Sequence, residues 1–249
     1  MFHSYEHIFR ERADAYQKAM ELYPEARNRE FELAVESAGV KTNEIICDAP
    51  AGGGYLRACV PESINSYLAV ETAPDFTSHC LLNGNDRVIR SPLHQIDLDD
   101  NSVNVCINLA GSHHLEDKKQ FFREAARLLK PGGRLVLADV EAGTNTDRFL
   151  NRFVDQNSSM GHQGVFLTAA TADEIAACGF NIQFNELVRF PWSFESKQDM
   201  GVFCKLLFGI DRADTDTVIA AVEQINGFMP GPGKVNMAWE LRYIVAQSF

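Results

Sequence analysis

The stretch Ile45–Leu56 constrains the fold of this chain more than any other. Its first three residues form a short apolar run of the kind that is buried on both faces of a parallel sheet. Asp48 ends the run, and Gly52–Gly54 then provide a turn without Cβ atoms, where a ligand can lie against bare N–H groups. A helix is expected to begin at Tyr55 and to add its positive N-terminal dipole. This order predicts the ligand site of a doubly wound α/β sheet.

Strands and helices alternate along much of the chain, which predicts βαβ units and a parallel sheet. The expected strands are 45–47, 67–70, 87–90, 103–109, 135–138, 181–190 and 237–246. The expected helices are 4–23, one ending at Gly39, one beginning at Pro74, 117–130, 144–156, a short one closed by Gly179, and two within 191–235. A chain of 249 residues, 45% of them hydrophobic, suits one domain over 1–249. Residues 1–40 would form a helical cover and residues 191–235 a helical insertion.

Charge and cysteine usage exclude several classes of partner. The formal net charge is −11, so a phosphate backbone would repel the chain, and no nucleic-acid substrate is expected. The six cysteines are scattered without a Cys-x-x-Cys pair, which favours reduced thiols and a cytoplasmic location. We expect neither a signal peptide nor a membrane contact, because the N-terminus is polar and no apolar run reaches spanning length.

The glycine turn fits one ligand class better than another. A dinucleotide site needs a third glycine inside the helix, and only Ala58 follows Gly54 at a comparable place. The stretch fits better the pattern Asp-x-Gly-x-Gly-x-Gly, with Pro50 in place of the first glycine. At these residues the chain resembles the class I S-adenosylmethionine-dependent methyltransferases. That resemblance implies S-adenosylmethionine as cofactor.

Three further motifs follow the family's order. Glu71 lies 23 residues after Asp48, where family members place an acid that accepts hydrogen bonds from both ribose hydroxyls. Residues 99–105 resemble the family's acidic turn into the fourth strand, with Asn104 in place of the usual Asp. Residues 128–135, Leu-Leu-Lys-Pro-Gly-Gly-Arg-Leu, match the turn into the fifth strand almost letter for letter.

The resemblance implies a doubly wound, mostly parallel sheet of seven strands, with the last strand antiparallel between the fifth and sixth. N-terminal helices would lie over the cofactor, and the insertion would shape the substrate pocket. The implied cofactor-binding residues are Asp48, Ala49, Pro50, Gly52, Gly54, Glu71, Leu93, Asn108 and Leu109. Leu93 is included for its backbone N–H alone, because residues 90–94 lack the acid that often binds the adenine amine.

Candidates for catalysis follow the fourth strand. Methyl transfer requires positioning and exclusion of water, and an acceptor that ionises late also needs a general base. His113 and His114 come after strand 103–109, so one of them contacts the acceptor or acts as base, or else one packs against or caps the next helix. Tyr16 lies beside the methyl group or in the core, and His162 lines the pocket or is solvated in a loop. No metal is expected, because the histidines lack ligand spacing.

The sequence gives alternative roles for some of the aromatic residues in the second half of the chain. Trp192 and Trp239 are expected in the core. Phe203, Phe208 and Phe228 either cover a hydrophobic acceptor or form the contact of a homodimer.

The sequence therefore predicts an S-adenosylmethionine-dependent methyltransferase that acts on a small-molecule acceptor by in-line O- or N-methylation. The alternative is a catalytically silent protein of the same fold that binds the cofactor or serves as a partner subunit. Pro50 and Asn104 favour the alternative, whereas Gly52, Gly54 and Glu71 favour the enzyme.

Overall fold

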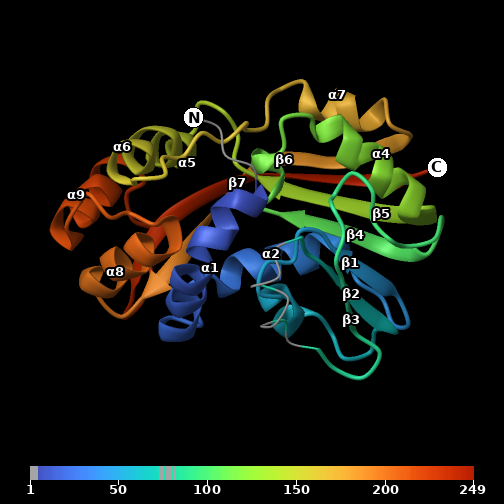
Figure 1. Cartoon of the computed structure of the whole chain (residues 1–249), viewed down its shortest axis with the longest axis horizontal. Coiled ribbons are helices and arrows are strands. Elements are labelled where there is room, and N and C mark those ends of the chain that lie inside the picture. Colours follow the sequence, from blue (N-terminus) through green and yellow to red (C-terminus); the bar gives the residue numbers. More distant parts are fainter. Residues whose placement is uncertain (1–4, 73–75, 77–79, 81) are drawn as a thin grey trace.

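One seven-stranded sheet organises the computed structural model, which describes residues 5–72, 76, 80 and 82–249. The strands are β1 (Ile45–Asp48), β2 (Ser66–Val70), β3 (Arg87–Ile89), β4 (Val103–Leu109), β5 (Leu129–Asp139), β6 (Phe180–Phe194) and β7 (Val235–Ser248). Their order across the sheet is β3-β2-β1-β4-β5-β7-β6, with β1 to β5 parallel and β7 antiparallel to both neighbours (Figure 1). The predicted doubly wound α/β sheet and the antiparallel last strand are confirmed.

Helices cover both faces of this sheet. The longer ones are α1 (Tyr5–Leu22), α2 (Asn28–Ala38), α4 (Lys118–Leu128), α8 (Lys197–Phe208) and α9 (Thr215–Ile225), and α7 (Thr171–Ala176) is shorter. Because side chains alternate along a strand, Ile46 of β1 packs on the face that Phe31 of α2 covers, whereas Cys47 packs on the face of Phe121 of α4. The predicted start at residue 4 and the helix predicted from Pro74 lie outside the described residues.

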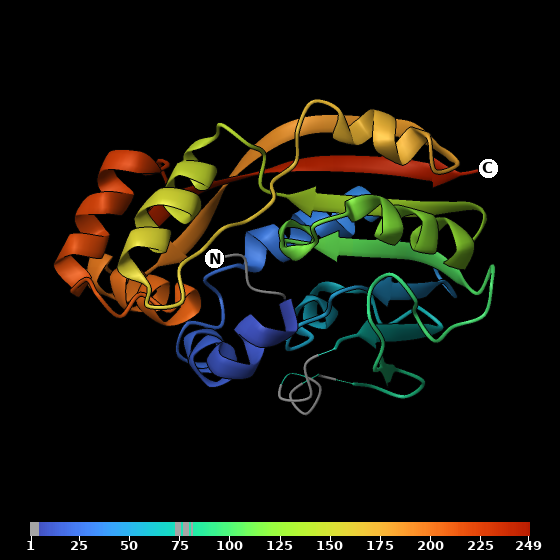
Figure 2. The same cartoon turned by 45° about the horizontal axis from the view of Figure 1, so that its top comes forward.

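A helical group lies at one end of the sheet, where β6 and β7 extend beyond their neighbours (Figures 1 and 2). It comprises α8, α9 and one continuous helical stretch made of α5 (Asn145–Arg148), η3 (Phe149–Val154) and α6 (Asp155–Asn157). The hydrogen bonds of η3 are π-helical, a local widening that is frequent at functional sites. Helix α1 packs along α8, so the N-terminal helices and the helices between β6 and β7 meet.

Strand ends differ from the prediction where pairing over long sequence distances decides them. β6 continues four residues beyond the predicted end at Phe190, because each residue through Phe194 finds a partner on β7. β5 begins at Leu129 instead of Leu135, because Leu129 pairs with Val103 before the bulge that contains the Pro-Gly-Gly turn.

The element after the glycine turn also differs from the prediction. In place of a full helix, η1 (Tyr55–Cys59) is a five-residue 3₁₀ segment. Pro61 accounts for its length, since a proline disfavours helical geometry in the residue before it. A segment this short adds little dipole to the neighbouring site.

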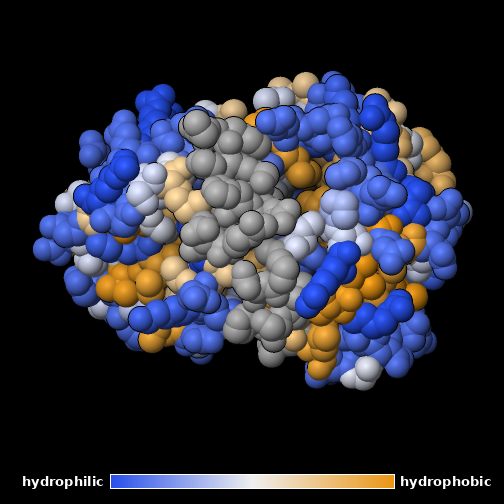
Figure 3. Space-filling model, viewed as in Figure 1, coloured by the Kyte–Doolittle hydropathy of each residue, from blue (hydrophilic) through white to orange (hydrophobic). Residues whose placement is uncertain are grey.

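The surface is mostly polar on the face drawn in Figure 3, where hydrophobic residues form separate patches between hydrophilic ones. Among the described residues, none of the helices combines the length and the apolar character that crossing a bilayer requires.

Candidate functional site

The glycine turn at the end of β1 adopts backbone angles that glycine permits. Gly52 and Gly54 have φ values of 53° and 71°, and a Cβ on Gly54 would lie 3.0 Å from the Cα of Cys80. Contrary to the prediction, two backbone N–H groups of this turn already donate hydrogen bonds within the protein. Gly52 donates to Oε2 of Glu71, which follows the neighbouring strand β2, at 2.9 Å. Gly54 donates to the carbonyl of Ala51 at 2.9 Å, because the tight turn closes on itself.

The carboxyl ends of β1 and β4 meet beside this turn. Asn108 donates from Nδ2 to the carbonyl of Ala49 at 2.6 Å, which fixes the residue before Pro50. Its Oδ1 is buried without a hydrogen-bond partner in the described part of the chain. Pro50 follows a cis peptide bond, and a Cβ on Gly111 would lie 2.4 Å from its ring. The two loops are therefore in close contact.

A cavity with an empty volume of about 1000 Å³, open mouth included, extends from this turn toward the helical end of the sheet. Of the predicted cofactor residues, Asp48, Pro50, Gly52 and Leu109 line it. The other five, Ala49, Gly54, Glu71, Leu93 and Asn108, are not among its lining residues, and the side chain of Leu93 is buried in the core on the α4 face of the sheet.

His113 lies in the wall of the same cavity and is held by a carboxylate. Its Nδ1 is 2.8 Å from Oδ1 of Asp139 at the end of β5, and its backbone N–H donates to Oδ2 at 2.8 Å. Ser112 also donates to Oδ2, at 2.6 Å. Burial disfavours ionisation of Asp139, but the His113 charge and these hydrogen bonds outweigh it, so the Asp139 pKa lies below its usual value. Since an ionised carboxylate can only accept, this hydrogen bond needs a proton on Nδ1 of His113, so in the neutral tautomer the lone pair is on Nε2.

His114 and His162, the other two histidines that the sequence suggested for the site, lie beside His113. The ring centroid of His113 is 4.1 Å from that of His114 and 5.6 Å from that of His162. Burial, followed by the neighbouring charges, lowers the pKa of His114 well below its usual value and that of His162 to about 3. Both are therefore neutral at physiological pH. No group of described side chains has the arrangement of a metal site.

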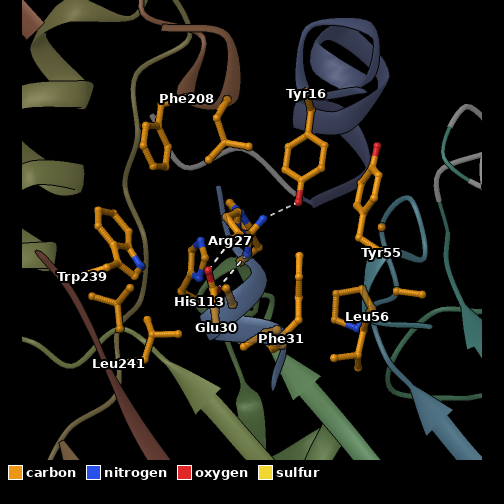
Figure 4. A pocket seen from close by; sticks show the side chains of 18 of the residues that line it. Tyr16, Arg27, Glu30, Phe31, Tyr55, Leu56, His113, Phe208, Trp239 and Leu241 are labelled. Atoms are coloured by element: carbon orange, nitrogen blue, oxygen red, sulfur yellow. Dashed lines mark hydrogen bonds and ion pairs between the residues drawn. The ribbon is translucent and has the colours of Figure 1, made fainter. Parts of the chain in front are cut away.

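A buried ion pair crosses the floor of the cavity. Arg27 donates from Nε and Nη2 to the two carboxylate oxygens of Glu30, both at 2.8 Å, and from Nη1 to the Tyr16 hydroxyl at 2.6 Å. Glu30 also accepts from the indole of Trp192 at 2.8 Å. Figure 4 shows Arg27, Glu30 and His113 between two walls, with Tyr55 on one side and Trp239 on the other.

Aromatic rings form the wall away from the glycine turn. Trp192 and Trp239 are buried as predicted, with ring centroids 4.3 Å apart and planes inclined by 20°. Phe208 stacks beside them, 5.8 Å from Trp239. The three phenylalanines between β6 and β7 have separate roles: Phe208 lines the cavity, Phe203 is fully buried, and Phe228 is 37% exposed beside Lys197.

Arg27 and Glu30 are site residues that the sequence interpretation missed, although the sequence carries a signal for them. Glu30 falls on the buried stripe of α2 with Phe31, Ala34 and Ala38, and Arg27 is buried at the N-cap one turn before it. Charged residues on a buried helical stripe need partners, and that need points to a built ion pair.

Asp48 gives the protein a testable pH dependence. Burial raises its pKa from 3.8 to about 7; a hydrogen bond from Tyr67 opposes this rise and the charge of Glu71 adds to it. The raised pKa means that protonated Asp48 stabilises the fold fully below about pH 4 and that this contribution is lost as the pH rises through about 7. We expect the free energy of unfolding to fall by about 2 kcal/mol or more across this range, and Asp48→Asn to remove that fall. Urea unfolding at about pH 5 and about pH 8 measures it.

The matched control is Asp14→Asn, which removes an exposed carboxylate from α1 and should keep the wild-type pH profile. An Asp48→Asn protein with an unchanged profile would contradict the assignment.

A family model and several known proteins match part of this chain. Residues 47–137 match the family described as methyltransferase domain. Phthiotriol/phenolphthiotriol dimycocerosates methyltransferase of Mycobacterium leprae is 31% identical over 111 residues, which are 43% of this chain and 40% of that protein. The chain spans between 40% and 58% of the length of the curated relatives that it matches.

Solved structures share the fold at low sequence identity. A methyltransferase structure from Bacillus halodurans aligns with a TM-score of 0.64 at 17% identity, covering 87% of this chain and 97% of that one. Geranyl diphosphate C-methyltransferase of Streptomyces coelicolor, solved with S-adenosyl-L-homocysteine, aligns with a TM-score of 0.61 at 13% identity, covering 94% and 84%. Residues 47–137 are therefore similar to the methyltransferase domain, and the chain shares the fold of solved methyltransferase structures.

Proposed function

We propose that this protein transfers the methyl group of S-adenosylmethionine to an oxygen or nitrogen atom of a small molecule, with His113 as general base. One observation carries the proposal. A single cavity joins the glycine turn at the end of β1 to an imidazole that is fixed by a buried carboxylate. Cofactor and acceptor can therefore lie side by side in a space that the helices shield from water.

The β1 end of the cavity suits the cofactor. Glu71 already holds the glycine turn through Gly52, and its carboxylate is the group proposed to accept from the ribose. Asp48 is a buried acid beside this turn and suits a cationic part of the ligand. Leu109 lines the cavity between this end and the acceptor side. When bound there, the cofactor supplies a methyl group on an electrophilic sulfonium.

The end of the cavity near His113 suits an acceptor that must lose a proton. With Nδ1 of His113 bound to Asp139, its Nε2 is the atom that takes the proton. Asp139 is a positioning residue, since it sets the tautomer and stabilises the imidazolium that forms. The Tyr16 hydroxyl accepts from Arg27 and lines the same cavity. Leu207 and Phe208 close this end, so the helices between β6 and β7 shape the acceptor pocket in this proposal.

Titration calorimetry with S-adenosylmethionine and S-adenosylhomocysteine tests the cofactor end. We expect both compounds to bind, and Glu71→Gln to weaken both by about tenfold or more through loss of a charged acceptor. Glu186→Gln removes an exposed carboxylate from β6 and should leave the affinities unchanged.

A methyl-release assay over a panel of small alcohols, phenols, acids and amines then tests transfer. Wild-type protein without affinity for either compound would overturn the proposed function. Binding without transfer to any member of the panel would favour the catalytically silent subunit.

A further inference from the structure

Arg12 of α1 lines the acceptor side of the cavity, and its guanidinium forms no ion pair with a carboxylate among the described residues. Its Nη2 donates to the carbonyl of Leu207 at 2.6 Å, near the carboxyl end of α8. Its Nε is buried and has no hydrogen-bond partner in the described part of the chain. A guanidinium offers five N–H donors, so one backbone carbonyl leaves most of its capacity unused.

The carboxylates that line or adjoin the cavity are engaged elsewhere. Glu30 binds Arg27 and Trp192, and Asp139 binds His113 and Ser112. Asp48, at the opposite end, accepts from the hydroxyl of Tyr67. Within the described residues, the Arg12 charge is therefore not neutralised by any of these acids. Burial lowers the Arg12 pKa to about 10, so the side chain is still a cation at neutral pH.

The position of Arg12 separates it from the cofactor end. A Cβ on Gly209, just after α8, would lie 2.7 Å from its Nε, so the guanidinium packs against the carboxyl end of α8. The positive charge also contributes to the low pKa of His114 and His162, which places it near the histidine cluster. Phe208 and Leu207 of α8 continue the wall from this point toward the two tryptophans.

We propose that Arg12 is the binding site for an anionic group of the acceptor, a carboxylate or a group of like charge, and that the apolar body of the acceptor lies against Phe208 and Trp239. This inference rests on the proposed function, since it names the substrate class of the same site. Planar anions match a guanidinium because two parallel N–H groups can donate to two oxygens. A buried cation without a counter-ion is costly, and an anionic ligand removes that cost when it binds.

Indole-3-acetate and indole-3-acetamide test the proposal because they share a shape and differ in charge. Calorimetry uses the full chain with and without saturating S-adenosylhomocysteine. We expect wild-type protein to bind the acid about tenfold or more tighter than the amide, and Arg12→Gln to abolish that preference. Arg12→Lys should keep part of it, and Lys18→Gln, an exposed cation on the same helix, should keep all of it.

Three results would overturn the inference. The first is wild-type protein without preference for the acid. The second is an Arg12→Gln protein that keeps the preference, since Arg12 would then only cap α8. The third is an Arg12→Gln protein that loses affinity for S-adenosylhomocysteine but not for 5′-methylthioadenosine, which lacks the amino-acid carboxylate, because the anion would then belong to the cofactor. Failure of the proposed function is recognised separately, by absent cofactor binding in wild-type protein.

Discussion

Replacing Glu30 with Gln is expected to lower the free energy of unfolding by about 3–5 kcal/mol. The substitution keeps the size of the side chain and removes the charge that neutralises Arg27. Burial disfavours the charged form of Arg27, and the charge of Glu30 is the main influence that holds its pKa above the usual value. Without Glu30, a buried cation would remain with Tyr16 as its polar partner, and Trp192 would lose a charged acceptor. Urea unfolding followed by circular dichroism measures the loss.

Glu32→Gln is the matched control on the same helix. It breaks a pair with Arg29 whose side chains are 39% and 49% exposed, and such surface pairs contribute about 1 kcal/mol or less. If Glu30→Gln cost no more than this control, the ion pair would not be a main support of the cavity floor.

With an acceptor identified by the methyl-release assay, His113→Asn is expected to lower kcat for methyl transfer by about 100-fold or more. Asparagine can still donate to Asp139 from its amide group, but it cannot take a proton at the place of Nε2. Affinity for S-adenosylmethionine should change little, because the glycine turn and Glu71 are untouched. Single-turnover rates with calorimetric affinities separate the two effects.

His94→Asn is the control, since His94 is an exposed histidine that does not line the cavity. Asp139→Asn should shift the pH profile of the rate as well as lower it, because the imidazole would lose the group that fixes its tautomer. Near-normal kcat in His113→Asn would refute the role of general base.

Local sequence patterns were sufficient to predict the order of elements. The apolar run before Asp48 became β1, and the amphipathic stretch after Asp117 became α4, with the Asp117 carboxylate accepting from the N–H of Lys119. Strand lengths were not predictable in this way. The end of β6 at Phe194 depends on a partner more than 40 residues further along the chain, about which a local pattern holds no information.

In the candidate site, too, local patterns predicted some features, whereas others depend on contacts between distant parts of the chain. The sequence placed Asp48 and Glu71 at neighbouring strand ends because parallel strands align their carboxyl ends. It could not place Arg12 beside Leu207, or bring Trp192 against Trp239, because these contacts depend on how α1 and α8 pack on the sheet. Helix packing of this kind has no signal in the spacing of residues within one element.

The stacked indoles have a practical consequence for every binding experiment described above. The chain contains two tryptophans, and both line the cavity. A molecule that enters the cavity changes the polarity around both indoles, so the intrinsic emission of the protein reports on occupancy without a label. Selective excitation of indole would then follow acceptor arrival in real time, with no background from chromophores elsewhere in the fold.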